Sequence, residues 1–163
     1  MSGLAAFTAF HVLLSLVGIG TGFIAVFGLI GGRWLNLWIK IFLVTTILTS
    51  VTGFLFPFKG ITPGIVIGII SLVALAISLY ALRIKKLAGG WRSAFVVTAV
   101  VAQYLNFFVL IVQLFEKVPT LHALAPTGSE GPFKAAQITA LILFVVLGFL
   151  ATKNFRHAQL QTA

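Results

Sequence analysis

Five long apolar runs constrain the fold of this chain more than any other feature of its sequence. They cover residues 4–30, 37–58, 63–82, 93–115 and 135–152. About 20 apolar residues in an α-helix cross the roughly 30 Å hydrocarbon layer of a bilayer. Irregular backbone cannot cross lipid, because its polar groups would lack hydrogen-bond partners. The sequence therefore predicts an all-α integral membrane bundle of five transmembrane helices, forming a single domain over residues 1–163.

The composition supports a membrane environment over a soluble one. Hydrophobic residues make up 60% of the chain and charged residues only 8%, against roughly half and roughly a quarter in soluble domains. The second and third runs are the least certain spans, since Pro57 and Pro63 flank a short connection that would also suit a shallow hairpin. We favour two full spans, because a buried re-entrant loop needs backbone partners from elsewhere.

The basic residues predict the orientation of the bundle. The net charge is +9, and eight of the eleven Lys and Arg residues fall on one side of the predicted membrane. The positive-inside rule then places the N-terminus outside and the C-terminus in the cytoplasm. All three tryptophans, Trp34, Trp38 and Trp91, fall at the same inner interface. We interpret the basic residues as orienting the helices and contacting membrane lipids, and we expect no nucleic-acid partner.

Several classes of chemistry are excluded or disfavoured. The chain has no cysteine, and its only acidic residues are Glu116 and Glu130, outside the apolar runs. There is no phosphate-binding loop, no dinucleotide fingerprint and no metal-ligand spacing. The sequence therefore favours a protein that is not an enzyme and holds no metal.

A set of polar residues inside the spans is the best candidate for a ligand site. Small polar residues and glycines are typical of helix packing, but His11, Gln103, Asn106 and Gln137 are larger and costly to bury without partners. At 1.5 Å per residue, His11, Asn106 and Gln137 can share a level in the outer half of the membrane with Thr49 and Thr52. We predict an outward-facing polar recess whose ligand-binding residues are His11, Thr49, Thr52, Gln103, Tyr104, Asn106 and Gln137.

The loop at 116–134 lies above the predicted recess. It contains His122, Glu130 and a run of Pro and Gly residues that impose turns. A lid over the recess and an ordinary solvated connection are both open interpretations, because loops of this length are often but not always functional.

Three functions remain open. The first is binding of a small or lipidic ligand in the recess, or a role as accessory subunit of a larger membrane complex. The second is a small transporter or channel, homo-oligomeric because five helices enclose little volume; a faint repeat between residues 42–54 and 95–107 motivates it. The third is a redox protein that binds haem or quinone through His11. A structural His11 is favoured over a haem ligand, because His122 and His157 lie on opposite sides of the membrane.

Three segments, 49–58, 68–73 and 121–133, resemble those of a group of small bacterial inner-membrane proteins of unknown function. The resemblance covers most of the chain. It implies a multi-pass protein of the bacterial cytoplasmic membrane and a small stand-alone bundle. It implies no activity.

Overall fold

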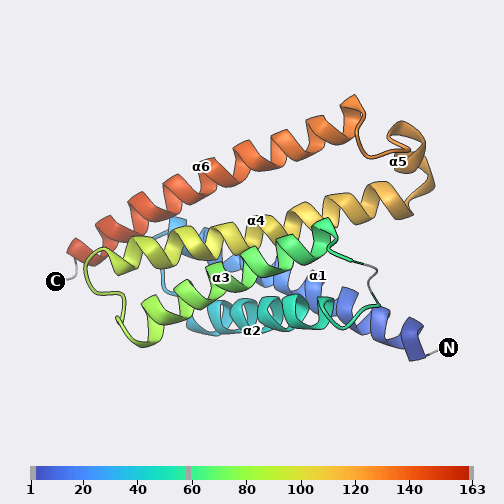
Figure 1. Cartoon of the computed structure of the whole chain (residues 1–163). Helices are drawn as coiled ribbons and strands as arrows, with labels where there is room; N and C mark the ends of the chain where they lie inside the picture. The colour runs from blue at the N-terminus through green and yellow to red at the C-terminus, as the bar shows by residue number, and fades with distance from the viewer. Residues whose placement is uncertain (1–2, 58–59, 162–163) are drawn as a thin grey trace.

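The computed structural model describes residues 3–57 and 60–161, with side chains described as far as Phe155. Within these ranges the chain is helical and contains no strand. Figure 1 shows its six helices, which are α1 (Gly3–Ile30), α2 (Asn36–Gly53), α3 (Pro63–Arg83), α4 (Trp91–Lys117), α5 (Pro119–Leu124) and α6 (Gly131–Gln161).

Five of these helices are long and apolar enough to cross a membrane, so the predicted all-α fold with five candidate spans is confirmed. The shortest, α2, has 18 residues and is therefore about 27 Å long. Large apolar side chains cover the outside of the bundle: Leu13 is 61% exposed, Val145 63% and Phe149 65%. Monomeric soluble proteins rarely expose an apolar surface of this extent. These are the properties of a multi-pass membrane protein.

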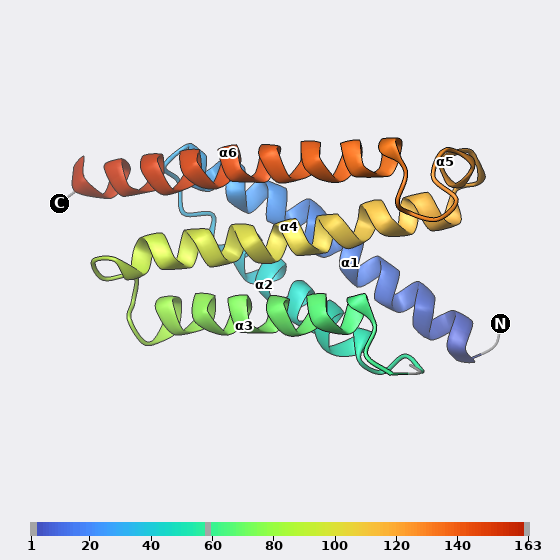
Figure 2. The ribbon, with the colours of Figure 1, turned by 45° about the horizontal axis from the view of Figure 1, so that its top comes forward.

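The helices form two layers. Figure 2 shows α3, α4 and α6 side by side, with α4 in the middle, and α1 and α2 crossing obliquely behind them. The long helix α1 packs along α2 and also contacts α4 and α6. Helix α4 contacts each of the other helices, so it forms the centre of the bundle.

The core depends on small residues where helices approach closely. Ala81, Ala102 and Ala151 are fully buried, together with larger side chains such as Phe42 and Phe95. A second, smaller cluster lies beneath α5 and is formed by Ile111, Phe115, Ala125 and Ala140. Close helix contact through small residues is the usual packing mode inside membranes.

Helices α2 and α6 differ most from the predicted spans. Helix α2 ends at Gly53 instead of residue 58. Two hydrogen bonds that span three residues close its last turn, from the Phe54 amide to the Val51 carbonyl and from the Leu55 amide to the Thr52 carbonyl. Pro57 disfavours helical geometry in the residue before it, which explains why the helix does not continue.

Helix α6 extends beyond both ends of the predicted 135–152 span. Its extra C-terminal turns carry buried Phe155 and also Asn154, whose side-chain amide donates to the Ile30 carbonyl at 2.9 Å. This bond satisfies one of the carbonyls left free at the end of α1. The predicted loop at 116–134 also contains the short helix α5.

Charge separates the two ends of the bundle. The basic end carries the α1–α2 and α3–α4 connections; its basic side chains are Arg33, Lys40, Arg83, Lys85, Lys86, Arg92 and Lys153. The opposite end carries the α2–α3 connection and α5, and its charged side chains are Glu116, Lys117, Glu130 and Lys134. We call it the acidic end because both glutamates of the chain lie there. Residues 58 and 59 and the side chains of Arg156 and His157, which belong to the predicted pattern, lie outside the described residues.

Candidate functional site

His11 joins the first two helices. Its Nδ1 atom lies 2.8 Å from Thr52 Oγ1, and its ring meets Phe56 edge-on at 5.1 Å between centroids. The Thr52 hydroxyl donates to the Leu48 carbonyl at 2.7 Å, so it has no second hydrogen to give and accepts from Nδ1–H of the imidazole. The polar contact of His11 is thus an interhelical bond between α1 and α2.

Asn106 joins α4 to α1. Its Oδ1 accepts a hydrogen bond from Ser15 Oγ at 2.9 Å, and its side chain packs against Gly18. A Cβ at Gly18 would lie 3.2 Å from Asn106 Nδ2 and 3.1 Å from Thr46 Oγ1. Neither of these two buried atoms has a hydrogen-bond partner among the described residues. The glycine therefore lets three helices bring polar groups into close contact.

Gln103 is fully buried one turn nearer the basic end. Its Nε2 donates to the Ile19 carbonyl at 2.8 Å, whereas its Oε1 has no partner within the described part of the chain. A Cβ at Gly22 would overlap the Gln103 amide. The absence of a side chain at Gly22 is what makes room for Gln103 between α1 and α4.

The other three residues of the predicted recess have different surroundings. The Thr49 hydroxyl donates to the Thr45 carbonyl of its own helix at 2.8 Å. The Tyr104 ring faces Phe144 of α6 at 5.7 Å between centroids. Gln137, on α6, donates from Nε2 to the Phe108 carbonyl at 3.3 Å. Gln103 and Asn106 thus lie together against α1, while Tyr104 and Gln137 lie at the α4–α6 contact.

The two loop residues predicted to form a lid contact their own segment. His122 Nδ1 lies 3.3 Å from the Phe115 carbonyl. Glu130 accepts from the Thr127 hydroxyl at 2.8 Å and from the Ser129 amide at 3.0 Å. These bonds, that from the Thr127 hydroxyl foremost, lower the pKa of Glu130 to about 2. The Glu130 carboxylate, directly before α6, thus holds residues 127–130 in a compact turn.

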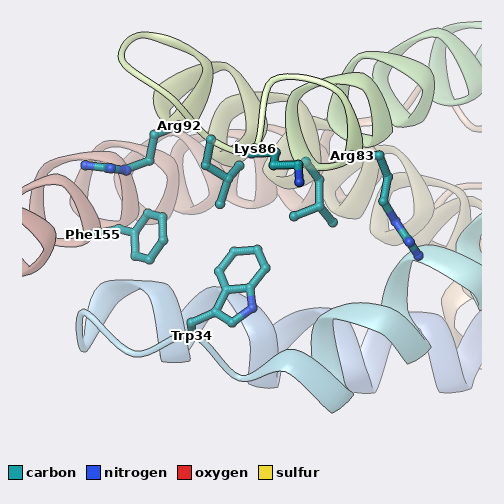
Figure 3. A pocket seen from close by; sticks show the side chains of 7 residues that line it. Trp34, Arg83, Lys86, Arg92 and Phe155 are labelled. Carbon is teal, nitrogen blue, oxygen red and sulfur yellow. The ribbon is translucent and has the colours of Figure 1, made fainter.

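A cavity lies at the opposite, basic end. It has a volume of about 530 Å³, within the range usual for small-molecule sites. Three helices and two connections contribute to its wall, whose residues are Trp34, Leu82, Arg83, Lys86, Leu87, Arg92 and Phe155. Figure 3 shows Arg92, Lys86 and Arg83 along the α3–α4 side, with Trp34 opposite them. We call this cavity the Trp34 pocket.

Aromatic contacts hold Trp34 in place. Its ring stacks on Phe155 of α6 at 5.8 Å between centroids and lies 5.4 Å from Phe95 of α4. Phe95 and Phe155 are each only 1% exposed. The apolar wall of the pocket is therefore continuous with the hydrophobic core.

The charge of the Trp34 pocket is entirely positive among the described side chains. Arg83, Lys86 and Arg92 line it, whereas Glu116 and Glu130 lie at the other end of the bundle. Arg92 Nε is buried and has no hydrogen-bond partner in the described structure. Helix α4 begins next to the pocket with no acidic residue in its first turn, so its dipole adds positive potential. This arrangement favours an anion.

The backbone at Lys86 and Leu87 is strained. Both residues have a positive φ, 50° and 59°, where L-residues with a side chain are disfavoured. The Leu87 amide bonds to the Ala81 carbonyl at 3.0 Å and closes the end of α3. This turn directs both side chains to the pocket wall, and such strain persists only where surrounding structure imposes it.

Lys85, the neighbour of Lys86, contacts different groups. Its Nζ lies 5.6 Å from the ring centroids of both Tyr80 and Trp91, a favourable cation–π geometry. Lys85 does not line the pocket. Adjacent lysines with equal charge therefore have separate environments.

A second cavity, of about 270 Å³, runs between α2 and α3. Its wall is mostly apolar and consists of Trp34, Asn36, Ile39, Lys40, Leu43, Val44, Ile47, Leu79, Leu82 and Arg83. We call it the α2–α3 groove. Trp34, Leu82 and Arg83 line both cavities, so the two are adjacent.

The sequence contained part of the signal for the Trp34 pocket. Tryptophan and basic residues cluster on one side of the predicted membrane, but this pattern alone indicates orientation and lipid contact and does not indicate a cavity. Leu87 carried no signal, because its role depends on an unusual backbone conformation. Phe155 fell beyond the predicted fifth span.

Comparison of the chain with protein-family models, with curated proteins and with solved structures found no match. The comparisons thus assign no family to the chain. Within the described residues, no group of three or more His, Asp or Glu side chains is placed to hold a metal ion.

Proposed function

We propose that this chain is a membrane protein that crosses the bilayer five times and binds an amphiphilic anion in the Trp34 pocket. It acts without catalysis, as a ligand-binding protein or as the ligand-binding subunit of a larger membrane complex. The ligand site proposed here lies at the basic end, whereas the sequence pattern had pointed to the polar residues in the other half.

One observation carries the proposal. Three cationic side chains surround an open cavity whose remaining wall is apolar, and both carboxylates of the sequence lie at the far end of the bundle. Cations without protein partners attract an anionic group, and adjoining indole and leucine surfaces favour an apolar extension of the same ligand.

The membrane orientation follows from the same charge distribution. Seven basic side chains are described at the basic end and two at the acidic end, and this asymmetry supports a cytoplasmic basic end under the positive-inside rule. The Trp34 pocket then lies at the cytoplasmic headgroup level, where anionic lipids and cytoplasmic anions can both reach it.

The redox alternative has less support. The His11 Nδ1 atom is engaged by Thr52, and the ring lies against Phe56 between α1 and α2. The Nδ1 bond gives the imidazole a structural role between α1 and α2, but it leaves Nε2 free within the described residues, as in metal-ligating histidines. The geometry alone is therefore compatible with both roles. An absorption spectrum of protein purified from haem-replete cells tests the alternative, since a Soret band would support it.

Anion binding can be tested with dodecyl phosphate, a soluble amphiphilic anion. Thermal unfolding of the protein in an uncharged maltoside detergent is measured with and without this probe. A ligand that binds only the folded state raises the unfolding temperature. We expect such a rise for the wild type and for Lys85→Gln, and a smaller one for Lys86→Gln.

The two variants form a matched pair. Each removes one charge from the same turn, but only Lys86 lines the pocket. One basic residue near a membrane surface contributes about 1 kcal/mol, or about fivefold in affinity. Equal loss in both variants would show that only the overall charge matters, and no rise in the wild type would contradict the proposed function.

A further inference from the structure

The Trp34 pocket and the α2–α3 groove together join a cationic site to an apolar one, as an amphiphilic ligand requires. The pocket supplies the cations, and the groove supplies apolar side chains such as Ile39, Leu43 and Ile47. Arg83 lies where the two cavities meet. A molecule with an anionic head and an apolar chain can therefore occupy both cavities at once.

The length of the groove matches one leaflet of a bilayer. Its wall along α2 runs from Asn36 to Ile47, which is about 16 Å at 1.5 Å per residue. Half of the roughly 30 Å hydrocarbon layer is about 15 Å. The groove thus begins at the charged end of the helices and reaches the depth where an acyl chain of that leaflet ends.

We propose that the two cavities form one binding site for an anionic glycerophospholipid, with the phosphate at Arg83, Lys86 and Arg92 and one acyl chain in the α2–α3 groove. This inference rests on the proposed function and names the ligand class. The guanidinium groups of Arg83 and Arg92 line the pocket and offer directional donors for phosphate oxygens, and the strained turn at Lys86 presents a third cation.

The chemistry of the site distinguishes this lipid from its neighbours in the membrane. A zwitterionic phospholipid brings its own cation, which is repelled by three basic side chains at the pocket. A free phosphate neutralises the cations, but it has no apolar part to occupy the groove. The anionic diacyl lipid is the ligand that matches both cavities.

Tryptophan quenching by lipids brominated in one acyl chain tests this placement. The variant Trp38→Phe/Trp91→Phe leaves Trp34 as the only tryptophan, and Trp34 lines both cavities. The protein is reconstituted in bilayers that contain either brominated phosphatidylglycerol or brominated phosphatidylcholine. We expect phosphatidylglycerol to quench Trp34 at about one fifth of the phosphatidylcholine concentration or less.

Two further changes in this background separate head from chain. Lys86→Gln weakens the headgroup contact, and Val44→Phe fills the groove from α2. Val51→Phe is the matched control for the second change, since it adds the same ring to an exposed position of the same helix outside the groove; Val44 is 55% exposed and Val51 44%. We expect Lys86→Gln and Val44→Phe to reduce the preference for phosphatidylglycerol, and Val51→Phe to preserve it.

The outcomes distinguish this inference from the proposed function. If Lys86→Gln abolishes the preference but Val44→Phe and Val51→Phe behave alike, the acyl-chain assignment is overturned and an anion site remains. If the two lipids quench equally while dodecyl phosphate still stabilises the protein, the phospholipid assignment is likewise overturned. If neither effect is found, both proposals fail. If inorganic phosphate displaces brominated phosphatidylglycerol as effectively as unlabelled phosphatidylglycerol does, the acyl chain contributes nothing to binding.

Discussion

The two halves of the bundle use polar residues in opposite ways. In the middle of the bundle and toward the acidic end, neutral side chains such as Asn106 and Gln103 are buried against glycines of α1 and bond to neighbouring helices. At the basic end, charged side chains surround an open cavity and face no described carboxylate. A buried neutral group is largely used by packing, whereas an unpaired cation at a cavity remains free to bind.

This difference shows why burial cost alone does not locate a ligand site. A polar group in lipid must find a partner, and a neighbouring helix supplies one as readily as a ligand does. The predicted recess residues follow this rule in part. Gln103, Asn106 and Gln137 each bond to a neighbouring helix through one amide atom, whereas the other amide atom of each has no partner among the described residues. The structure therefore predicts that changes in the buried half alter stability, while changes at the basic end alter binding.

The largest effect is expected for Gly22→Ala. The added methyl group overlaps the fully buried Gln103 amide, which must move and lose its bond to Ile19. Overpacking and an unsatisfied buried amide together cost about 3 kcal/mol of the free energy of unfolding. Unfolding by SDS titration in mixed micelles measures the change.

Gly20→Ala is the control for this prediction, because no atom lies within 4 Å of a Cβ at Gly20. We expect it to leave stability unchanged or slightly increased, since alanine favours helix. Adding Gln103→Ala to Gly22→Ala should recover part of the loss. Equal effects of the two glycine substitutions would contradict the close contact between Gly22 and Gln103.

A smaller effect is expected for Asn106→Leu. This substitution keeps the branched shape of the side chain but leaves the Ser15 hydroxyl without its acceptor. We expect a loss of about 1 kcal/mol. Adding Ser15→Ala removes the second partner and should restore most of the stability, because replacing both partners is nearly neutral. A double-mutant cycle in detergent measures the coupling, and a value near zero would contradict the bond.

Thr52→Val should destabilise the protein by about 0.6 kcal/mol, the average for interhelical hydrogen bonds in membranes. It removes the acceptor of His11 and keeps the shape of the side chain. Thr49→Val is its control, because within the described part of the chain the Thr49 hydroxyl bonds only to the Thr45 carbonyl of its own helix. The same unfolding assay compares the two, and a greater loss for Thr49→Val would contradict the assignment.

The smallest effect concerns the loop before α6. Because hydrogen bonds lower the pKa of Glu130 from 4.5 to about 2, its contribution to local order is complete above pH 4.5 and is lost as the pH falls through about 2. The protection of the Thr127 and Ser129 amides, taken relative to the intrinsic exchange rate at each pH, should fall over this interval, and Glu130→Ala should lower it at neutral pH. If neither the lower pH nor Glu130→Ala alters the protection of these amides, the order of the loop does not depend on the Glu130 carboxylate.

The sequence was sufficient for the helical architecture, because apolar runs of membrane length admit little else. It placed Gln103 and Asn106 on one face, and the structure brings both against α1. It was not sufficient for the Trp34 pocket, which depends on two residues with positive φ and on turns of α6 beyond the predicted span. Such features arise from tertiary packing and leave no periodic pattern.

One measurement tests the contrast between the two halves most directly. Native mass spectrometry of protein purified from phosphatidylglycerol-containing membranes counts the lipid molecules retained by the wild type, Arg83→Gln/Lys86→Gln and Gln103→Leu/Asn106→Leu. We expect the basic-end variant to lose retained phosphatidylglycerol and the buried-half variant to keep it despite lower stability. Loss in the buried-half variant, with retention in the basic-end variant, would contradict the account.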